Sequence, residues 1–406
     1  MLNKRSFQSV TKTNRFCLQF FGMLPLNGPP SRLKNLVSYC LTVYTLFSVT
    51  SVIFPVFHLM LTSNLDLEGV LDALNVTAGV FGGEIRMIVI AMHRRRIHRL
   101  MSICEALWND ADNAADYKII SAWAKRAKSL TNLLCTFTIF AVGVFVILPI
   151  IRQLLPGSDI STRTWPYQIN MDATQSPRYE LYYALQTCFV CNALCSVIGC
   201  DSTGPLLAIH ACGQLKLIQT WLLSIFENET DSSLVNGKDE IIVKEKLKKC
   251  VQRHQFVMHF CDEIEELVRY ANLTQVLAEM YMMAISASRL SRMQGAGIFK
   301  QIGPLLMAAS QIFISCFASE QLSSESVMVA ETAYAIPWYR CSPRIRKMIL
   351  LIINRSQRPV RLTIGKFGVM SLATFGSVKL TTIILNYTRR FVTLFFMSVI
   401  SLFSCE

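Results

Sequence analysis

Seven stretches of mostly apolar residues run along the chain, each about as long as a membrane-spanning helix. A bilayer core of about 30 Å requires about 20 apolar residues in a helix. Four of the stretches contain no Asp, Glu, Lys or Arg, and three contain at least one. The first group is 36–60, 130–151, 181–200 and 301–319, and the second is 70–92, 270–290 and 367–388. This pattern predicts an all-α membrane protein with seven transmembrane helices.

The composition agrees with a polytopic membrane protein. Of the 406 residues, 52% are hydrophobic and 17% are charged, whereas soluble proteins have about 25% charged residues. The net charge of +13 could suggest nucleic-acid binding. Such proteins gather basic residues on one soluble face, but here the basic residues lie between the apolar stretches. We therefore expect contact with membrane lipid and none with nucleic acid.

The Lys and Arg residues lie mainly on one side of the predicted membrane. The segments before the first stretch and after the second, fourth and sixth hold 30 of them, and the segments on the opposite side hold 7. Short loops rich in Lys and Arg stay in the cytoplasm, so the N-terminus is predicted to be cytoplasmic. This is the reverse of a G-protein-coupled receptor, and the Asp-Arg-Tyr and Asn-Pro-x-x-Tyr motifs of those receptors are missing. No G protein is therefore expected as a partner.

We predict one receptor domain with two flanking segments. Residues 1–35 form a cytoplasmic N-terminal segment, residues 36–388 form the seven-helix domain, and residues 389–406 form an atypical apolar tail. The charge-free part of that tail, from Phe391 to Cys405, is too short to cross a bilayer. We interpret it as the product of an altered transcript end that impairs gating.

The second half of the chain contains long helical patterns. The helix of the fourth stretch is predicted to continue past Pro205 to Phe226, followed by a flexible loop over 227–240. Over 243–268 apolar residues recur every three to four positions, with Lys and Glu between them. This spacing predicts an amphipathic helix that leads into the fifth stretch, either extended into the cytosol or lying on the inner leaflet.

The sequence contains no arrangement of residues typical of an enzyme or a metal site. Its six His residues form no His-Glu-x-x-His pair, and no Gly-Lys-Ser/Thr loop is present. Cys188, Cys191, Cys195 and Cys200 follow a partly helical spacing, but no His or carboxylate is expected at their depth, so they are interpreted as packing residues. We predict neither catalysis nor a cofactor.

Ionisable side chains inside the predicted spans are the first candidates for functional residues, because they are costly to place in a membrane. Glu84 and Arg86 are two positions apart and point to different faces of a helix, so each is expected to find water or a neighbouring helix. Glu279 is interpreted as a side chain that faces water within the bundle.

A set of short motifs lies between residues 338 and 375. Trp-Tyr begins at Trp338, Arg-Lys at Arg346, Arg-x-Gln-x-Pro at Arg355, Gly-x-Phe at Gly365 and Ser-Leu-x-Thr-Phe at Ser371. In this order and spacing the motifs resemble those of the insect odorant receptors. The segment from Phe20 to Pro25 is similar to the part that precedes the first span in the same family.

The resemblance implies the odorant-tuned subunit of a ligand-gated, non-selective cation channel. Its expected partners are a small volatile ligand and an odorant co-receptor subunit, assembled as a heterotetramer in the dendrite membrane of olfactory sensory neurons. Helices 4 to 7 would extend into the cytosol and form an anchor between subunits. The residues implied in that anchor are Trp338, Tyr339, Arg346, Lys347, Arg355, Gln357, Pro359, Phe367, Ser371 and Phe375.

The resemblance also places a ligand cavity and a pore. The cavity is expected in the outer half of the bundle, between the second, third, fourth and sixth spans. Depth alone selects its candidate residues as Val80, Phe81, Phe140, Val144, Tyr183, Gln186, Thr187, Ile302, Leu306 and Ser310. The seventh span would line the pore, with the gate among Thr382, Ile383 and Ile384, although the sequence after Lys379 departs from the family pattern.

Two alternatives remain at this point. A gustatory receptor has the same inverted seven-span architecture, but its C-terminal Thr-Tyr and Gln-Phe pattern is absent here. A membrane transporter would show substrate accumulation instead of a ligand-evoked current.

Overall fold

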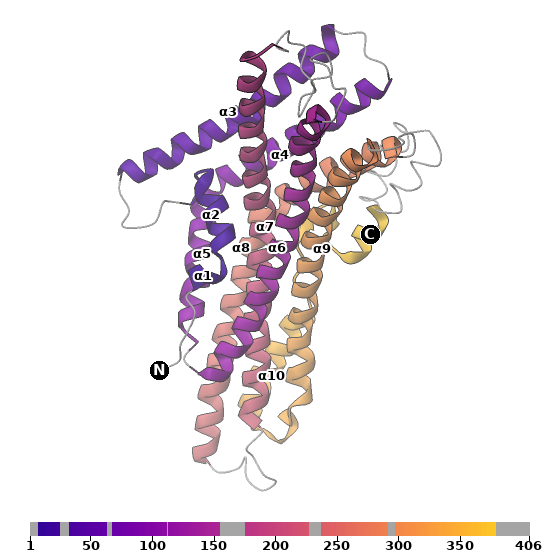
Figure 1. Cartoon of the computed structure of the whole chain (residues 1–406). Coiled ribbons are helices and arrows are strands. Elements are labelled where there is room, and N and C mark those ends of the chain that lie inside the picture. The colour runs from indigo at the N-terminus through magenta and orange to yellow at the C-terminus, as the bar shows by residue number, and fades with distance from the viewer. Residues whose placement is uncertain are drawn as a thin grey trace.

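Long α-helices dominate the structure (Figure 1). The computed structural model describes residues 7–24, 32–62, 67–111, 113–154, 175–226, 237–290 and 297–378. Its helices are α1 (Phe7–Val10), α2 (Lys12–Phe20), α3 (Arg32–Thr62), α4 (Leu67–Met92), α5 (Arg94–Asn109), α6 (Ala114–Leu154), α7 (Arg178–Phe226), α8 (Gly237–Leu290), α9 (Gly297–Ala335) and α10 (Pro343–Ser356). Each of the first six predicted stretches lies within one helix: α3, α4, α6, α7, α8 and α9, in that order.

Four of these helices, α3, α6, α7 and α9, are long and apolar enough to cross a membrane. The other two helices of the set, α4 and α8, hold ionisable side chains within their apolar stretches. Of the seventh predicted stretch, 367–388, the structure describes residues up to 378, and residues 372–378 are helical. The pore window at 382–384 and the tail at 389–406 lie outside the described residues.

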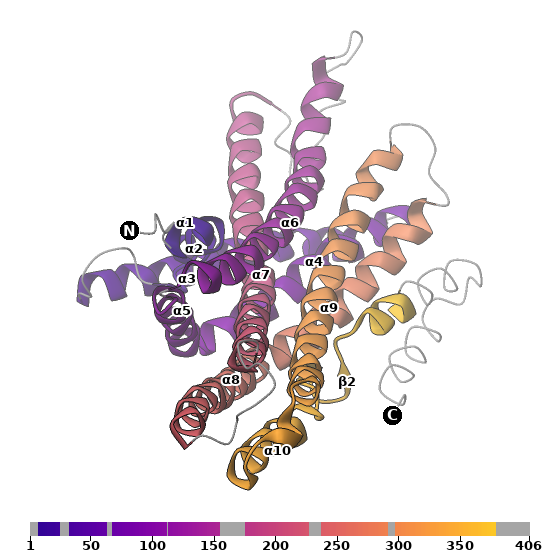
Figure 2. The ribbon, with the colours of Figure 1, turned by 90° about the horizontal axis from the view of Figure 1, so that it is seen from below.

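The helix α7 forms the centre of the bundle. Every residue from 198 to 215 is buried, although this segment includes polar side chains such as Asp201, Thr203 and Gln214. A helix that is buried all round must have neighbours on every side. Here the neighbours are α6, α8 and α9, with α2 and α3 completing the enclosure (Figure 2).

The N-terminal segment folds back onto α7. The ring of Phe21 is fully buried and lies over Gly199, where an added Cβ would come within 2.7 Å of Phe21 Cε1. The chain then turns at Gly22, whose φ of +79° belongs to the left-handed region that favours glycine. Ser38 Oγ, on α3, donates a hydrogen bond to the Gly22 carbonyl at 2.7 Å. The segment from Phe20 to Leu24 thus attaches the start of the chain to the core.

The extended helices agree with most of the sequence prediction and correct one part of it. The helix α7 runs through Pro205 to Phe226, and the amphipathic segment 243–268 continues into the fifth stretch as the single helix α8. The predicted loop over 227–240 is too long, because α8 already begins at Gly237. Helix formation there is favoured by continuity with the amphipathic repeat that follows.

The motifs near the C-terminus lie on the 3-10 helix η2 (Trp338–Arg340), on α10, and on a strap (residues 357–371) that joins α10 to the helix starting at residue 372. The strap contains the antiparallel strands β1 (Thr363–Ile364) and β2 (Gly368–Val369). Gly365 and Lys366 make the turn between the strands with positive φ. Ser371 Oγ accepts a hydrogen bond from Thr374 N at 3.1 Å, which caps the first turn of the helix.

Candidate functional site

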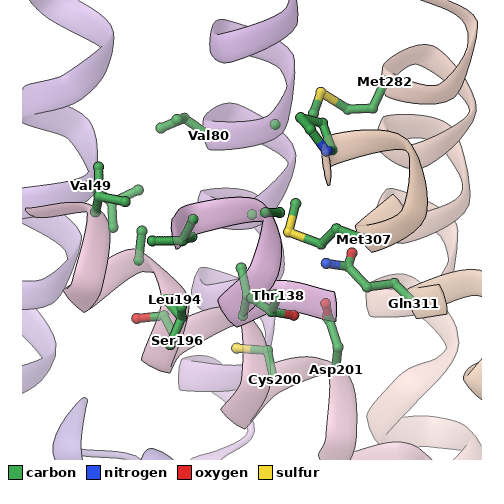
Figure 3. A pocket seen from close by; sticks show the side chains of 18 of the residues that line it. Val49, Val80, Thr138, Leu194, Ser196, Cys200, Asp201, Met282, Met307 and Gln311 are labelled. Atoms are coloured by element: carbon green, nitrogen blue, oxygen red, sulfur yellow. The ribbon is translucent and has the colours of Figure 1, made fainter. Parts of the chain in front are cut away.

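A cavity of about 200 Å³ lies inside the half of the bundle where the helices diverge (Figure 3). Six helices line it: α3, α4, α6, α7, α8 and α9. Much of its wall is made of aliphatic side chains and methionines. They include Val49, Val76, Val80, Met87, Val142, Val190, Leu194, Met282 and Met307.

The wall of the cavity is adaptable as well as apolar. Met282 and Met307 approach from α8 and α9 towards α4. Methionine is unbranched and polarisable, so it can rearrange around ligands of different shape. Gly79 lies beside Met282, and a Cβ added at Gly79 would be 3.1 Å from Met282 Cε. The absence of a side chain at this position therefore keeps the cavity open.

One end of the cavity is closed by a cluster of buried ionisable groups. Arg86 Nη1 lies 3.2 Å from Asp201 Oδ1, and Arg86 Nη2 lies 3.2 Å from Glu279 Oε1. All three side chains are 4% exposed. The cluster thus joins α4, α7 and α8, which are far apart in the sequence.

Gln311 on α9 completes this cluster. With its amide nitrogen turned towards the carboxylates, it donates to Glu279 and, at 3.3 Å, to Asp201 Oδ2. In this orientation the amide NH₂ group of Gln311 faces two carboxylate acceptors, and the orientation is assigned for that reason. Figure 3 shows Asp201 and Gln311 at the same end of the cavity, with Val80 and Met282 further towards the other end. The polar groups are therefore concentrated at one end of an apolar chamber.

The cluster also separates the main cavity from a smaller one. The second cavity measures about 20 Å³ and is lined by Arg86 and Asp201 together with Asn272, Gln275 and Ser315. Ser315 Oγ donates to Gln275 Oε1 at 3.2 Å, and Gln275 Nε2 has no hydrogen-bond partner in the described part of the chain. A volume of this size can hold one water molecule. The cluster is thus in contact with polar space on the side opposite the main cavity.

The interpretation of Glu279 as a water-facing side chain is wrong. Its carboxylate is buried and pairs with Arg86. The expectation for the second span agrees with the structure, because Arg86 finds its partners on neighbouring helices and Glu84 accepts a hydrogen bond from Thr50 on α3. A charged group in an apolar interior is stabilised by an opposite charge, and Arg86 supplies that charge for Glu279.

The ten candidate ligand residues are distributed unevenly around the cavity. Val80 lines it, and the other nine are not among its lining residues. Phe81, Phe140 and Leu306 are exposed on the outside of the bundle. Val144, Tyr183, Thr187 and Ile302 are half-buried, and Gln186 and Ser310 are buried.

Sequence reasoning missed most of the polar residues at the cavity. Asp201 directly follows the apolar stretch 181–200, and Gln311 and Thr138 are isolated polar residues in apolar stretches. No pattern in the sequence therefore singles them out. A usable signal was present: Arg86 and Glu279 are opposite charges in two different spans, and such charges are expected to find partners.

The predicted anchor residues lie on η2, on α10, on the strap and on the helix that follows it. Arg346 Nε donates to the Cys341 carbonyl at 2.6 Å, and the ring of Phe375 packs edge-on against Phe313 of α9 with centroids 5.5 Å apart. Tyr339 and Phe367 are exposed, at 59% and 57%. Lys347, Arg355 and Gln357 are also exposed, Trp338 and Pro359 are half-buried, and Ser371 caps the following helix.

Comparison with known proteins gives one consistent family. The family model described as "7tm Odorant receptor" matches residues 66–382. Odorant receptor 10 of Aedes albopictus is 23% identical over 73% of this chain and 78% of its own length. The odorant receptor coreceptor of Anopheles gambiae is 27% identical over 38% of this chain and 34% of its own length.

The fold has a solved counterpart. The insect olfactory receptor OR5 from Machilis hrabei, in complex with eugenol, superposes with a TM-score of 0.77. The match covers 96% of this chain and 98% of that receptor at 13% sequence identity. The two chains therefore share an overall fold in spite of very different sequences.

Proposed function

This chain belongs to the 7tm odorant receptor family, and on that premise we propose that it is the odorant-binding subunit of a heteromeric, ligand-gated, non-selective cation channel. The observation that carries the proposal is the cavity of about 200 Å³, which is lined by six helices and is apolar except at one end. Volatile ligands have large apolar surfaces and few hydrogen-bonding groups, and a chamber of this kind suits them.

The proposed partner is an odorant co-receptor subunit, with the two kinds of chain forming a heterotetramer. The similarity to odorant receptor coreceptors supports this partnership. The exposed side chains of η2, α10 and the strap, including Tyr339 and Phe367, are proposed to contact neighbouring subunits. Exposed aromatic and Arg side chains are typical of such interfaces.

The ligand would act by shifting an equilibrium between closed and open states. A ligand can do this only if it binds the open state more tightly than the closed one. The cavity is lined by α8 and α9, and the same two helices hold the strap that leads into the final helix. We propose that the final helix borders the pore, with its gate among Thr382, Ile383 and Ile384.

The buried and half-buried candidates Val144, Tyr183, Gln186, Thr187, Ile302 and Ser310 keep a proposed role at the edge of the cavity. Gln186 supports this view, because it is buried and neither polar atom of its amide has a hydrogen-bond partner in the described residues. The proposed location is the dendrite membrane of olfactory sensory neurons, with the N-terminus in the cytoplasm. An epitope ahead of Met1 is then expected to stain only after cells are permeabilised.

The decisive experiment records currents from cells that express this chain with and without an odorant co-receptor. Val80→Trp fills the cavity, and Ile88→Trp is the matched control because Ile88 lies on the same helix but is exposed outside. Overpacking costs typically about 1–3 kcal/mol, so Val80→Trp should raise the half-maximal odorant concentration about tenfold or more. Equal responses from the two variants would contradict ligand binding in this cavity.

A further inference from the structure

The charges at the polar end of the cavity do not balance. Asp201 and Glu279 are two carboxyl groups, and both are paired with the same guanidinium, that of Arg86. Among the described residues that line either cavity, Arg86 is the sole Lys or Arg and no His is present. With both carboxyls ionised, the cluster has one negative charge in excess.

An unbalanced charge in this position is unfavourable. The three side chains are 4% exposed, so water contributes little to their solvation. Placing a lone charge in such an interior costs several kcal/mol in free energy, unless a cation or a proton neutralises it. The amide of Gln311 donates hydrogen bonds to both carboxylates but carries no charge. The cluster thus favours the uptake of one proton or one additional cation.

The cavity extends to this cluster, and the rest of its wall determines which other chemical groups a ligand can carry. Arg86, Asp201, Glu279 and Gln311 all line it, so a ligand within it can touch the carboxylates. The remaining wall is predominantly aliphatic and sulfur-containing, and it would exclude a second charged group. A carboxylic acid ligand would be repelled, because its carboxylate would approach those of Asp201 and Glu279. Arg86 cannot offset this repulsion, because its charge is already shared between these two partners.

We propose that this cavity is tuned to small primary amines, which bind as ammonium ions beside Asp201 and Glu279 with their apolar tails along Val80, Met282 and Met307. The proposal rests on the function proposed above and specifies its ligand class. An ammonium group offers three hydrogen-bond donors, and bonds from charged donors to carboxylates are about twice as strong as neutral ones. One ammonium makes the cluster neutral.

The proton balance is the same for either starting state of the cluster. If the carboxyl pair holds one proton, that proton leaves the carboxyl oxygen and forms an N–H bond on the neutral amine, which is the stronger base. If the pair holds none, the amine enters already protonated from solution. Both routes end with two carboxylates, one guanidinium and one ammonium.

The first test measures binding without relying on a current. The purified full-length chain in detergent is heated with hexylamine, hexanol or hexanoic acid, and its Tm is compared at equal concentrations. A ligand that binds the folded state raises Tm. Hexylamine is expected to bind at least about tenfold more tightly than hexanol, and hexanoic acid more weakly than either. Sodium chloride at the same concentration controls for a general effect of cations and ionic strength.

The second test removes the excess charge. Glu279→Gln keeps the size of the side chain and an oxygen for Arg86, and the preference for hexylamine over hexanol should fall about tenfold or more. Asp201→Asn is the second variant of this kind, in case the first fails to fold. Glu84→Gln is the matched control, because Glu84 lies on α4 two residues from Arg86 but does not line the cavity. The Glu84→Gln variant should keep the preference for hexylamine over hexanol.

The results separate this inference from the proposed function. If hexylamine raises Tm no more than hexanol does, or if Glu279→Gln and Asp201→Asn leave the preference unchanged, the amine assignment is overturned. Amine-selective binding that disappears in those variants supports it, whether or not a current is recorded. The proposed channel function fails separately, if co-expression with the co-receptor gives no current for any bound ligand.

Discussion

The central helix α7 passes through two regions of opposite character. Between residues 198 and 215 every side chain is buried, and α2, α6, α8 and α9 enclose the helix. Between residues 181 and 197 most side chains are exposed or half-buried, and several line the cavity. We call these the packed segment and the cavity segment. Both are rich in apolar residues, so hydrophobicity alone does not distinguish them.

The comparison of the two segments shows how one helix can contribute both to a rigid core and to an adjustable ligand cavity. In the packed segment apolar side chains contact other parts of the protein, and tight packing makes this region rigid. In the cavity segment apolar side chains face outwards or towards open space, so neighbouring helices can move relative to one another at a lower cost in free energy. A stable frame is thus joined to a region that can adjust to a ligand.

The largest predicted effect comes from truncating one leucine on each segment of α7. Leu215 is fully buried in the packed segment, and Leu185 is largely exposed in the cavity segment. Leu215→Ala should lower the free energy of unfolding by about 2–5 kcal/mol, and Leu185→Ala by about 0.5 kcal/mol or less. Thermal unfolding of the purified variants measures both. Equal losses would show that the two segments are packed alike.

The second prediction concerns pH and the packed region around α8. Burial, and then the nearby charge of Arg355, lower the pKa of His254 to about 4. Its ring nitrogen shares a hydrogen bond with Ser356 Oγ at 3.2 Å. The fold favours the neutral ring, so this stabilisation is complete above pH 6.5 and is lost as the pH falls from there towards 4.

At pH 5 the loss due to His254 should be about 2 kcal/mol. His254→Gln should therefore flatten the dependence of Tm on pH between 6.5 and 4. The control His259→Gln removes an exposed His on the same helix. The prediction is wrong if both variants retain the full dependence.

The third prediction tests the close contact between the N-terminal segment and α7. An added Cβ at Gly199 would approach Phe21 Cε1 to 2.7 Å, whereas at Gly143 on α6 the nearest atom would be 4.0 Å away. Overpacking costs typically about 1–3 kcal/mol, and alanine regains about 1 kcal/mol in helix propensity. Gly199→Ala should lower stability by about 1 kcal/mol and Gly143→Ala should raise it. A rise in Tm for both would mean that Phe21 can move aside.

The smallest predicted effect is local and involves the strap. Glu265 on α8 accepts hydrogen bonds from Thr363 N at 2.8 Å and from the Thr363 hydroxyl. Glu265→Gln removes the charge that strengthens these bonds and should weaken the strap by about 1 kcal/mol. Hydrogen exchange of the Thr363 amide should rise about fivefold. The neighbouring variant Glu266→Gln, at an exposed ion pair with Arg96, should leave this exchange unchanged.

The helices were predicted correctly where an apolar stretch was long or where apolar residues recurred at helical spacing over many positions. Six apolar stretches fall inside six long helices, and the repeat over 243–268 appears as part of α8. Short helices were missed. No helix was predicted over 94–109, where the structure has α5 (Arg94–Asn109) with a buried face that includes Trp108.

The site was harder to predict than the elements. Depth along a helix can be estimated by counting residues, but the direction of a side chain also depends on how each helix is rotated. Phe81 and Phe140 were selected at plausible depths, and their helices turn them to the outside. Val80, one position away from Phe81, lines the cavity.

The amino-acid sequence by itself determined the class of the protein, the approximate positions of its apolar helices and its family. These properties depend on local composition, periodicity and short motifs, and each can be recognised within a few dozen residues. The tertiary structure alone decided that Arg86, Asp201, Glu279 and Gln311 meet at the end of a cavity. These residues lie on four helices, and their meeting depends on the packing angles and rotations of those helices, which no single segment of the chain encodes.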